Sequence, residues 1–310
     1  MYYAPYLPNA ILVISGIAAA YAQNLVLTND DGWAVAQIRA QYTALTDEGF
    51  EVVLSSPALD MSGTGSSTMI PLPLDITSCE YDSCPVGSPA KGYNASEARL
   101  NYVNAFPSDA AHYGIETLAP KFFDGAQPDL VVSGPNIGSK FNLVIRLRSR
   151  LGAAAEAARI GVSSVAFGGT SGSHVSYTTL VSTPNTTSTL SAYFYATLTT
   201  QFIRTFLTGG SAPVLPPETF VSVNYPAISA CAEPVDARWV LARNLANPFA
   251  EDIETCGTTS LPTENDVLGT TGCYVSVVVL DAWTKSDVNA TRQKAVLERL
   301  SALPLDCLPN

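Results

Sequence analysis

Short apolar runs alternate with amphipathic stretches along the chain. The first run, Asn24–Thr28, predicts a strand, and residues 35–45 carry apolar side chains at helical spacing. Gly49 predicts the end of that helix, and residues 51–55 form the next apolar run. A strand, a helix and a strand in this order predict a parallel pair with a right-handed crossover. Both strands should therefore end at one edge of the sheet, where doubly wound α/β folds bind ligands.

Later segments repeat this alternation and predict an α/β fold. We expect further strands at residues 129–133, 162–167, 219–224 and 274–280, and helices at residues 151–158, 189–207 and 292–300. Residues 71–125 are rich in Pro, Gly and Asn, which indicates insertions around short strands.

Composition narrows the class of protein. The chain has 310 residues, 47% of them hydrophobic and 14% charged, which is typical of one large globular domain or two smaller ones. Its net charge is −11, with 16 Lys and Arg residues, and this excludes the basic surface that binds nucleic-acid polymers. A small phosphorylated ligand remains compatible, because a metal ion can supply positive charge locally.

The N-terminal segment resembles a secretion signal. Residues 1–22 carry no charged side chain, and Ala10–Ala20 is an apolar run followed by the small-x-small sequence Ala20-Tyr21-Ala22. We therefore expect a signal peptide at residues 1–22, a mature start at Gln23 and a secreted, extracellular protein that does not associate with membranes. An N-terminal membrane anchor or a plain apolar tail is the alternative, although the run is short for a membrane span.

Two further features agree with secretion. N-x-[ST] sequons at Asn94, Asn185 and Asn289 predict a glycoprotein. The six cysteines are even in number and lack the paired spacing of zinc sites, so they predict up to three disulfides in an oxidising compartment. Cys79 and Cys84 are close enough in sequence to pair with each other, and the pairing of the other four stays open. Reduced cysteines would instead fit a cytosolic chain.

The strand ends carry the candidate chemistry. Asp30 and Asp31 directly follow the first strand, and adjacent, partly buried carboxylates repel each other unless a cation lies between them. Ser62 follows the second strand and Asn136 the third, so a hydroxyl and an amide oxygen should reach the same edge. A turn or a helix cap is the alternative for the aspartate pair alone, but it does not explain these distant partners.

An all-oxygen ligand set favours Mg²⁺, Mn²⁺ or Ca²⁺. The chain has only two histidines, His112 and His174, which argues against a histidine-based zinc site, and we interpret both as loop residues rather than general acids. The sequence has no nucleophile elbow, no Walker A motif and no dinucleotide fingerprint. A metal-dependent enzyme is therefore the leading hypothesis.

Three motifs in this order identify a family resemblance. The segments Thr28–Gly32, Ser62–Ser67 and Pro128–Gly138 resemble the SurE-type survival-protein family, and the resemblance spans roughly residues 24–283. It implies a Rossmann-like three-layer α/β sandwich with a mostly parallel sheet, present as one domain over residues 23–310 with a C-terminal extension. It also implies a metal-dependent phosphomonoesterase of the nucleotidase or acid phosphatase type, in a secreted, fungal-like branch.

The resemblance also implies roles for individual residues. The family's ligands for Mg²⁺ or Mn²⁺ fall on Asp30, Asp31, Ser62 and Asn136. Either aspartate could in addition orient the water that attacks phosphorus. Contacts with the phosphate or substrate are expected from Asn29, Gly63, Ser133, Arg148 and Ser149, although Asn29 could equally hydrogen-bond the adjacent turn. The implied substrate is small, such as a nucleoside monophosphate, and the implied assembly is a homodimer or a tetramer.

One segment departs from the family pattern. Arg148-Ser149-Arg150 stands where the family has Ser-Gly-Thr before a helix. The arginines could bind phosphate beside the helix N-terminus. They could instead obstruct the pocket and leave a catalytically impaired metal- or phosphate-binding protein, or the segment could be a gene-model or frameshift artefact. These alternatives stay open at this point.

Overall fold

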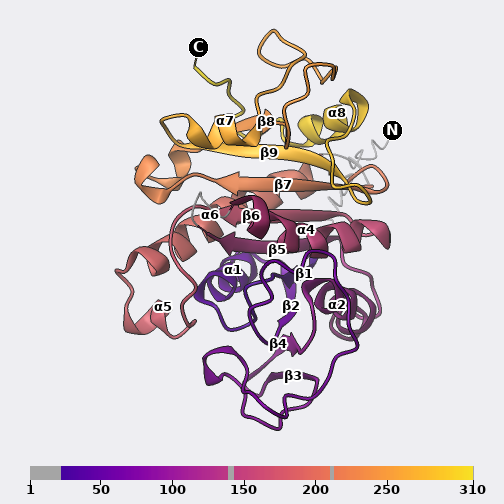
Figure 1. Ribbon diagram of the computed structural model, residues 1–310, viewed down its shortest axis with the longest axis vertical. Coiled ribbons are helices and arrows are strands. Elements are labelled where there is room, and N and C mark those ends of the chain that lie inside the picture. The colour runs from indigo at the N-terminus through magenta and orange to yellow at the C-terminus, as the bar shows by residue number, and fades with distance from the viewer. Residues whose placement is uncertain (1–21, 139–142, 210–212, 310) are drawn as a thin grey trace, which may run out of the picture.

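A nine-stranded sheet forms the centre of the molecule in the computed structural model, which describes residues 22–138, 143–209 and 213–309, without the side chains of residues 143–150 (Figure 1). The predicted signal peptide lies outside these ranges except for Ala22. The strands are β1 (Asn24–Thr28), β2 (Glu51–Pro57), β3 (Lys91–Asn94), β4 (Glu97–Val103), β5 (Leu130–Ile137), β6 (Ser164–Gly169), β7 (Thr219–Tyr225), β8 (Arg238–Ala242) and β9 (Tyr274–Asp281). The helices are α1 (Ala36–Asp47), α2 (Pro107–Tyr113), α3 (Ala119–Phe122), α4 (Leu143–Arg159), α5 (Thr179–Ser182), α6 (Thr187–Thr208), α7 (Glu264–Gly269) and α8 (Ala290–Arg299), with shorter turns at η1 (Glu80–Asp82) and η2 (Gly114–Leu118).

The strand order is β3-β4-β2-β1-β5-β6-β7-β9-β8. The strands from β4 to β7 run parallel, and β8 runs parallel to β9, whereas β3 is antiparallel to β4 and β9 is antiparallel to β7. This confirms the predicted α/β class with a mostly parallel sheet, and β1 and β2 form the predicted parallel pair. The carboxyl ends of β1, β2 and β5 consequently lie side by side.

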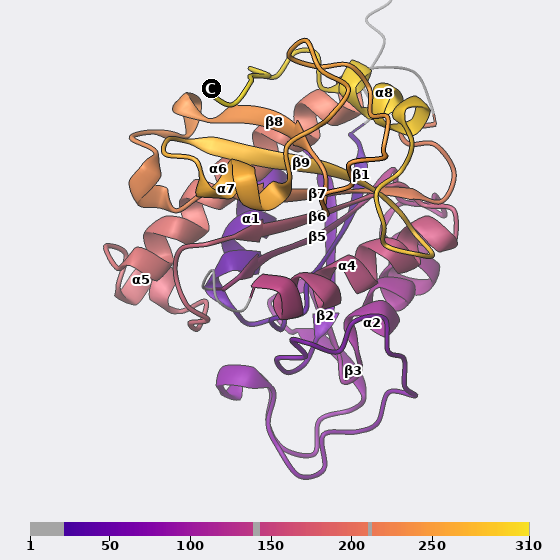
Figure 2. The ribbon, with the colours of Figure 1, turned by 45° about the horizontal axis from the view of Figure 1, so that its top comes forward.

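Helices cover both faces of the sheet, as Figure 2 shows. Successive side chains of a strand point to opposite faces. In β1, Leu25 and Leu27 therefore pack with Ile38 of α1 in one core cluster, while Val26 packs in another with Ala157 of α4. All three β1 side chains are fully buried, so the first strand is fixed between two helical layers.

The structure differs from the sequence-based expectation at several elements. Helix α4 begins at Leu143, so the backbone of residues 148–150 lies within a helix rather than in a loop before one; their side chains lie outside the described part of the structure. Residues 71–125 contain β3 and β4, which agrees with the short strands expected there, but they also contain the unpredicted helices α2 and α3. Strand β8, at the edge of the sheet, was also not predicted.

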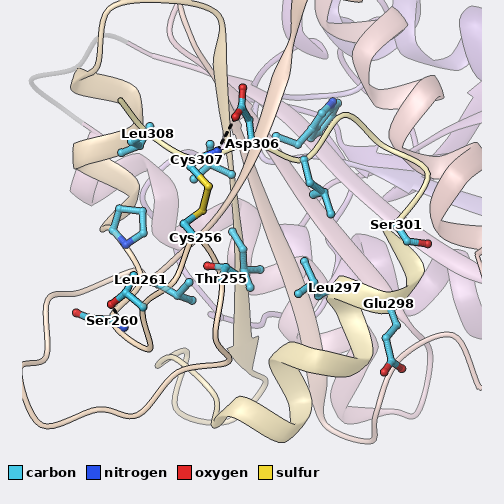
Figure 3. Close-up of a pocket in the computed structure, with 16 residues that line it drawn as sticks. Thr255, Cys256, Ser260, Leu261, Leu297, Glu298, Ser301, Asp306, Cys307 and Leu308 are labelled. Atoms are coloured by element: carbon cyan, nitrogen blue, oxygen red, sulfur yellow. Dashed lines mark hydrogen bonds between the residues drawn. A yellow bond between two sulfur atoms is a disulfide. The ribbon is translucent and has the colours of Figure 1, made fainter. Parts of the chain in front are cut away.

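The C-terminal segment covers the edge of β8. The Trp239 amide donates to the Pro304 carbonyl at 3.1 Å, and the Asp306 amide donates to the Trp239 carbonyl at 2.9 Å. The neighbouring Cys256–Cys307 disulfide lies at a cavity of about 850 Å³ (Figure 3). None of the residues that line this cavity belongs to the predicted site, so the cavity is separate from the strand-end residues.

The disulfides confirm the prediction from the even cysteine count. Cys79 pairs with Cys84, Cys231 with Cys273 and Cys256 with Cys307, so every described cysteine is oxidised. Within the described ranges, no helix combines the length and the apolar character needed to cross a membrane.

Candidate metal centre

The turn after β1 forms the base of the site. The Asn29 side-chain amide donates to the Gly32 carbonyl at 2.9 Å, and the Gly32 amide donates to Asn29 Oδ1 at 3.2 Å. Gly32 has φ = +99°, a left-handed conformation that favours glycine. Asn29 therefore contacts the adjacent turn, the second of its two expected roles, and the closed turn buries Asp30 and Asp31 completely.

Asp30 lies between the ends of β1 and β5. The side-chain amide of Asn136 donates to both carboxylate oxygens of Asp30 at 2.7 Å. The Asp30 carbonyl accepts a hydrogen bond of 2.8 Å from the Met61 amide, which ties the loop after β2 to the same place. The expected meeting of the three strand ends is therefore present around this carboxylate.

Asp31 contacts the remaining predicted group. Its Oδ1 accepts from the Ser62 hydroxyl at 3.3 Å, and its Oδ2 accepts from the Ile137 amide at 3.2 Å. Asp30, Asp31, Ser62 and Asn136 thus lie within one hydrogen-bonded cluster. The four residue types and their shared edge agree with the all-oxygen set that the sequence predicts.

Two further residues reach the cluster, and sequence reasoning missed both. His174, from the loop after β6, lies with Nε2 3.1 Å from Asp31 Oδ1 and 3.2 Å from the Ile137 carbonyl oxygen. Its Nδ1 lies 3.5 Å from Asp60 Oδ2. Asp60 precedes Ser62 by two residues in a strand-end loop, a signal that could have found it. His174 is in a loop as expected, and nothing in its local sequence points to Asp31.

His174 lies between two carboxylates, and this sets the charge of the site. Burial alone would lower the pKa of His174, but its hydrogen bonds to Asp31 and Asp60 outweigh burial and raise that pKa to about 11. Burial alone would raise the pKa of Asp60, but hydrogen bonds from His174 and Ser62 outweigh it and lower that pKa to about 2. An imidazolium therefore neutralises part of the negative charge at neutral pH.

A further carboxylate, Glu80, lies beside the turn. Burial, together with the negative charge of Asp60, raises the pKa of Glu80 from 4.5 to about 7. Its Oε2 is buried and has no hydrogen-bond partner in the part of the chain that the structure describes. A Cβ placed on Gly32 would come within 2.2 Å of that oxygen, so the carboxylate lies directly against the Gly32 backbone.

The donor set fits a divalent cation. Asp31, Asp60 and His174 each offer one ligand atom, and these three atoms lie within 4.8 Å of one another. This group shares Asp31 with the predicted set of Asp30, Asp31, Ser62 and Asn136. The carboxylates and the neighbouring Ser62 hydroxyl are suitable ligands for Mg²⁺ or Mn²⁺, whereas His174 would have to lose its proton before its imidazole could bind a cation.

The other residues predicted to contact phosphate or substrate lie on three different elements of the fold. Gly63 has φ = +84° and open space where a side chain would stand, which leaves its backbone accessible. Ser133 is buried in β5 opposite Thr28 of β1. Arg148 and Ser149 lie on α4 with side chains outside the described structure. Gly152 of the same helix approaches the 62–68 loop so closely that a Cβ would meet Gly65 O at 1.9 Å.

Fold and site together define an α/β protein with an acidic cluster, a candidate metal site, at the carboxyl edge of a mostly parallel sheet. The family model for the survival protein SurE matches residues 25–251, and the chain belongs to this family. The chain is 32% identical over 287 residues to an acid phosphatase of Yarrowia lipolytica, and the alignment covers 83% of this chain and 78% of the yeast protein.

Other relatives match a shorter stretch. The 5′-nucleotidase SurE of Methanococcoides burtonii is 34% identical over 146 residues, so the alignment spans 47% of this chain and 48% of that protein. The crystal structure of the SurE protein from Aquifex aeolicus superimposes with a TM-score of 0.54 and 20% identity, covering 88% of this chain and 98% of the other. This likeness establishes the shared fold.

Proposed function

We propose that this SurE-family protein is a divalent-metal-dependent phosphoric monoester hydrolase. The observation that carries the proposal is the convergence of two fully buried carboxylates, Asp30 and Asp31, with Ser62 and Asn136 at the ends of three strands. Family membership supports it, because relatives bear the names acid phosphatase and 5′-nucleotidase.

The predicted set of Asp30, Asp31, Ser62 and Asn136 would hold Mg²⁺ or Mn²⁺ in this proposal. A bound cation polarises a phosphoryl oxygen and lowers the pKa of bound water. Asn136 fixes the Asp30 carboxylate through its two hydrogen bonds, and the Ile137 amide fixes Asp31. These contacts hold the carboxylates in place before substrate arrives, which lowers the cost of organising the site.

The other groups would surround the phosphate. Gly63 has room for close backbone approach, and the positively charged His174 places a cation beside Asp31 where a phosphoryl oxygen would carry negative charge. The substrate we propose is a small phosphate ester such as a nucleoside monophosphate. The relatives named 5′-nucleotidase support this class, and the net charge of −11 disfavours nucleic-acid polymers.

Hydrolysis of a nitrophenyl phosphate and of a nucleoside monophosphate with added Mn²⁺ or Mg²⁺ tests the proposal. We expect Asp30→Asn to abolish turnover, whereas the exposed Asp75→Asn, which removes the same charge, should leave it unchanged. Equal rates for the wild type and Asp30→Asn would reject the site. A wild-type protein that binds Mn²⁺ without turnover, and gains activity when Ser-Gly-Thr replaces residues 148–150, would support the catalytically impaired alternative.

We also propose secretion, with residues 1–22 as a signal peptide and residues 23–310 as one domain with a C-terminal extension. The three disulfides support an oxidising compartment. Asn185 and Asn289 are exposed and Asn94 is half-buried, so all three sequons can carry glycans. Mass spectrometry of protein from culture medium, before and after glycosidase treatment, tests the mature start and the glycans. Light scattering tests the proposed homodimer or tetramer.

A further inference from the structure

We infer that Glu80 is a positioning residue of the metal centre, which strengthens cation binding from a loop that the Cys79–Cys84 disulfide holds in place. The inference rests on the proposed function, since it needs a cation at the strand-end cluster. It adds a residue outside the predicted ligand set, and it links the metal affinity to the oxidation state of a disulfide.

The short disulfide-closed loop is fixed to the end of β2. The Glu80 amide donates to the Ala58 carbonyl at 3.0 Å, directly after β2 and two residues before Asp60. Within the loop, the Cys79 amide donates to the Cys84 carbonyl at 3.0 Å, and the bridge joins Cα atoms 4.9 Å apart. Backbone bonds and the disulfide therefore position Glu80 with little freedom relative to the strand ends.

Gly32 leaves the space that the Glu80 carboxylate fills. The carboxylate oxygen Oε2 lies where a side chain on Gly32 would begin, and Gly32 directly follows Asp31. Any residue with a Cβ at this position would displace the Glu80 carboxylate. Gly32 is therefore needed for two reasons: the turn requires its left-handed conformation, and the absence of a side chain leaves room for the Glu80 carboxylate.

The environment of Glu80 disfavours its negative charge unless a cation is near. Oε2 is buried without a described hydrogen-bond partner, and burial and the negative charge of Asp60 outweigh the attraction of His174 and the hydrogen bond with Tyr81. A divalent cation at the cluster reverses this balance, because attraction to two positive charges replaces repulsion by like charges. Glu80 is not among the three groups that share a common ligand position, so it acts through its charge rather than as a direct ligand.

The Mn²⁺ dissociation constant, measured by isothermal titration calorimetry at about pH 8, tests this role, since the pKa of about 7 leaves Glu80 ionised there. We expect Glu80→Gln to weaken Mn²⁺ binding about tenfold, the usual effect of losing a group that supports metal ligands. The matched control is Asp75→Asn, an exposed carboxylate five residues earlier, which should leave the constant unchanged.

The disulfide supplies a second, independent measurement. Cys79→Ser combined with Cys84→Ser should weaken Mn²⁺ binding in the same direction, and adding Glu80→Gln to that pair should cause no further loss. Wild-type affinity in Glu80→Gln, or a loss equal to that of Asp75→Asn, would overturn the inference. Asp31→Asn separates it from the proposed function: if Asp31→Asn loses Mn²⁺ binding and turnover while Glu80→Gln binds normally, only the role of Glu80 fails.

Discussion

His174 Nε2 lies 3.1 Å from Asp31 Oδ1, and the two residues come from loops that follow β6 and β1. The imidazole also contacts Asp60 through its other nitrogen, so one side chain connects two carboxylates of the candidate metal centre. A group that fixes the orientation of a metal ligand usually matters nearly as much as the ligand itself.

Replacing His174 should therefore impair the enzyme without unfolding it. We expect His174→Gln to lower kcat/KM for a nitrophenyl phosphate between about 10- and 100-fold, because Asp31 loses its charged partner. The matched control is His112→Gln, which changes the other histidine of the chain, an exposed residue on α2. Equal losses in both variants would show that the contact with Asp31 has no special role.

The sequence was sufficient to predict the β1–α1–β2 unit and the edge of the sheet where the site lies. The β1–α1–β2 unit has apolar runs and helical spacing long enough to recognise, and the oxygen-bearing residues lie at the strand ends or a few residues after them. Because parallel strands end at one edge, the approach of Asp30, Asp31, Ser62 and Asn136 follows from topology alone. The hydrogen bonds between Asn136 and Asp30 are the clearest example.

The rest of the site depends on loop conformation, which has no periodic pattern. His174 reaches Asp31 only because of the path of the loop between β6 and α5, and Glu80 reaches Gly32 only because a disulfide turn folds back on the end of β2. The start of α4 was missed for a related reason: residues 143–150 join a helix whose recognisable pattern is the alanine-rich stretch after Leu151.

The metal-free protein should have a pH-dependent stability set by His174 and Asp60. Folding raises the pKa of His174 from 6.5 to about 11, so protonated His174 stabilises the folded state. This stabilisation is complete below about pH 6.5 and is lost as the pH rises toward about 11. The folded state lowers the pKa of Asp60 from 3.8 to about 2, so that stabilisation is present above about 3.8 and is lost as the pH falls through about 2.

Glu80 contributes in the same direction as His174, but at lower pH. Its pKa rises from 4.5 to about 7 on folding, so its ionisation reduces stability across that window. Urea midpoints measured with a chelator should thus fall as the pH rises above about 4.5. The Glu80→Gln variant should lack the fall in urea midpoint below about pH 7, and the His174→Gln variant should lack the fall above that pH. A flat profile for the wild type would contradict both assignments.

Gly32→Ala should reduce metal affinity more than stability. The added Cβ would come within 2.2 Å of Glu80 Oε2, the end of a flexible side chain that can move away. Because alanine is unfavourable in the left-handed conformation of this position, the free energy of unfolding should fall by about 1 kcal/mol. Mn²⁺ binding should weaken about as much as in Glu80→Gln. Gly49→Ala is the control, since Gly49 has φ = +98° and nothing within 4 Å of an added Cβ. Calorimetry should find equal stability losses but a weaker Mn²⁺ constant only for Gly32→Ala.

Gly152→Ala should damage the loop that carries Ser62. A Cβ at this position of α4 would come within 1.9 Å of the Gly65 carbonyl oxygen, and backbone cannot move away as a side chain can. Helix propensity alone would favour alanine by about 1 kcal/mol. We expect instead a loss of about 2 kcal/mol in the free energy of unfolding, the usual cost of overpacking, together with a fall in kcat/KM as the loop shifts away from Asp31. The control is Gly269→Ala in α7, where nothing lies within 4 Å of the new atom. If urea unfolding shows Gly152→Ala to be as stable as this control and its turnover is normal, the close contact between α4 and the loop does not position Ser62.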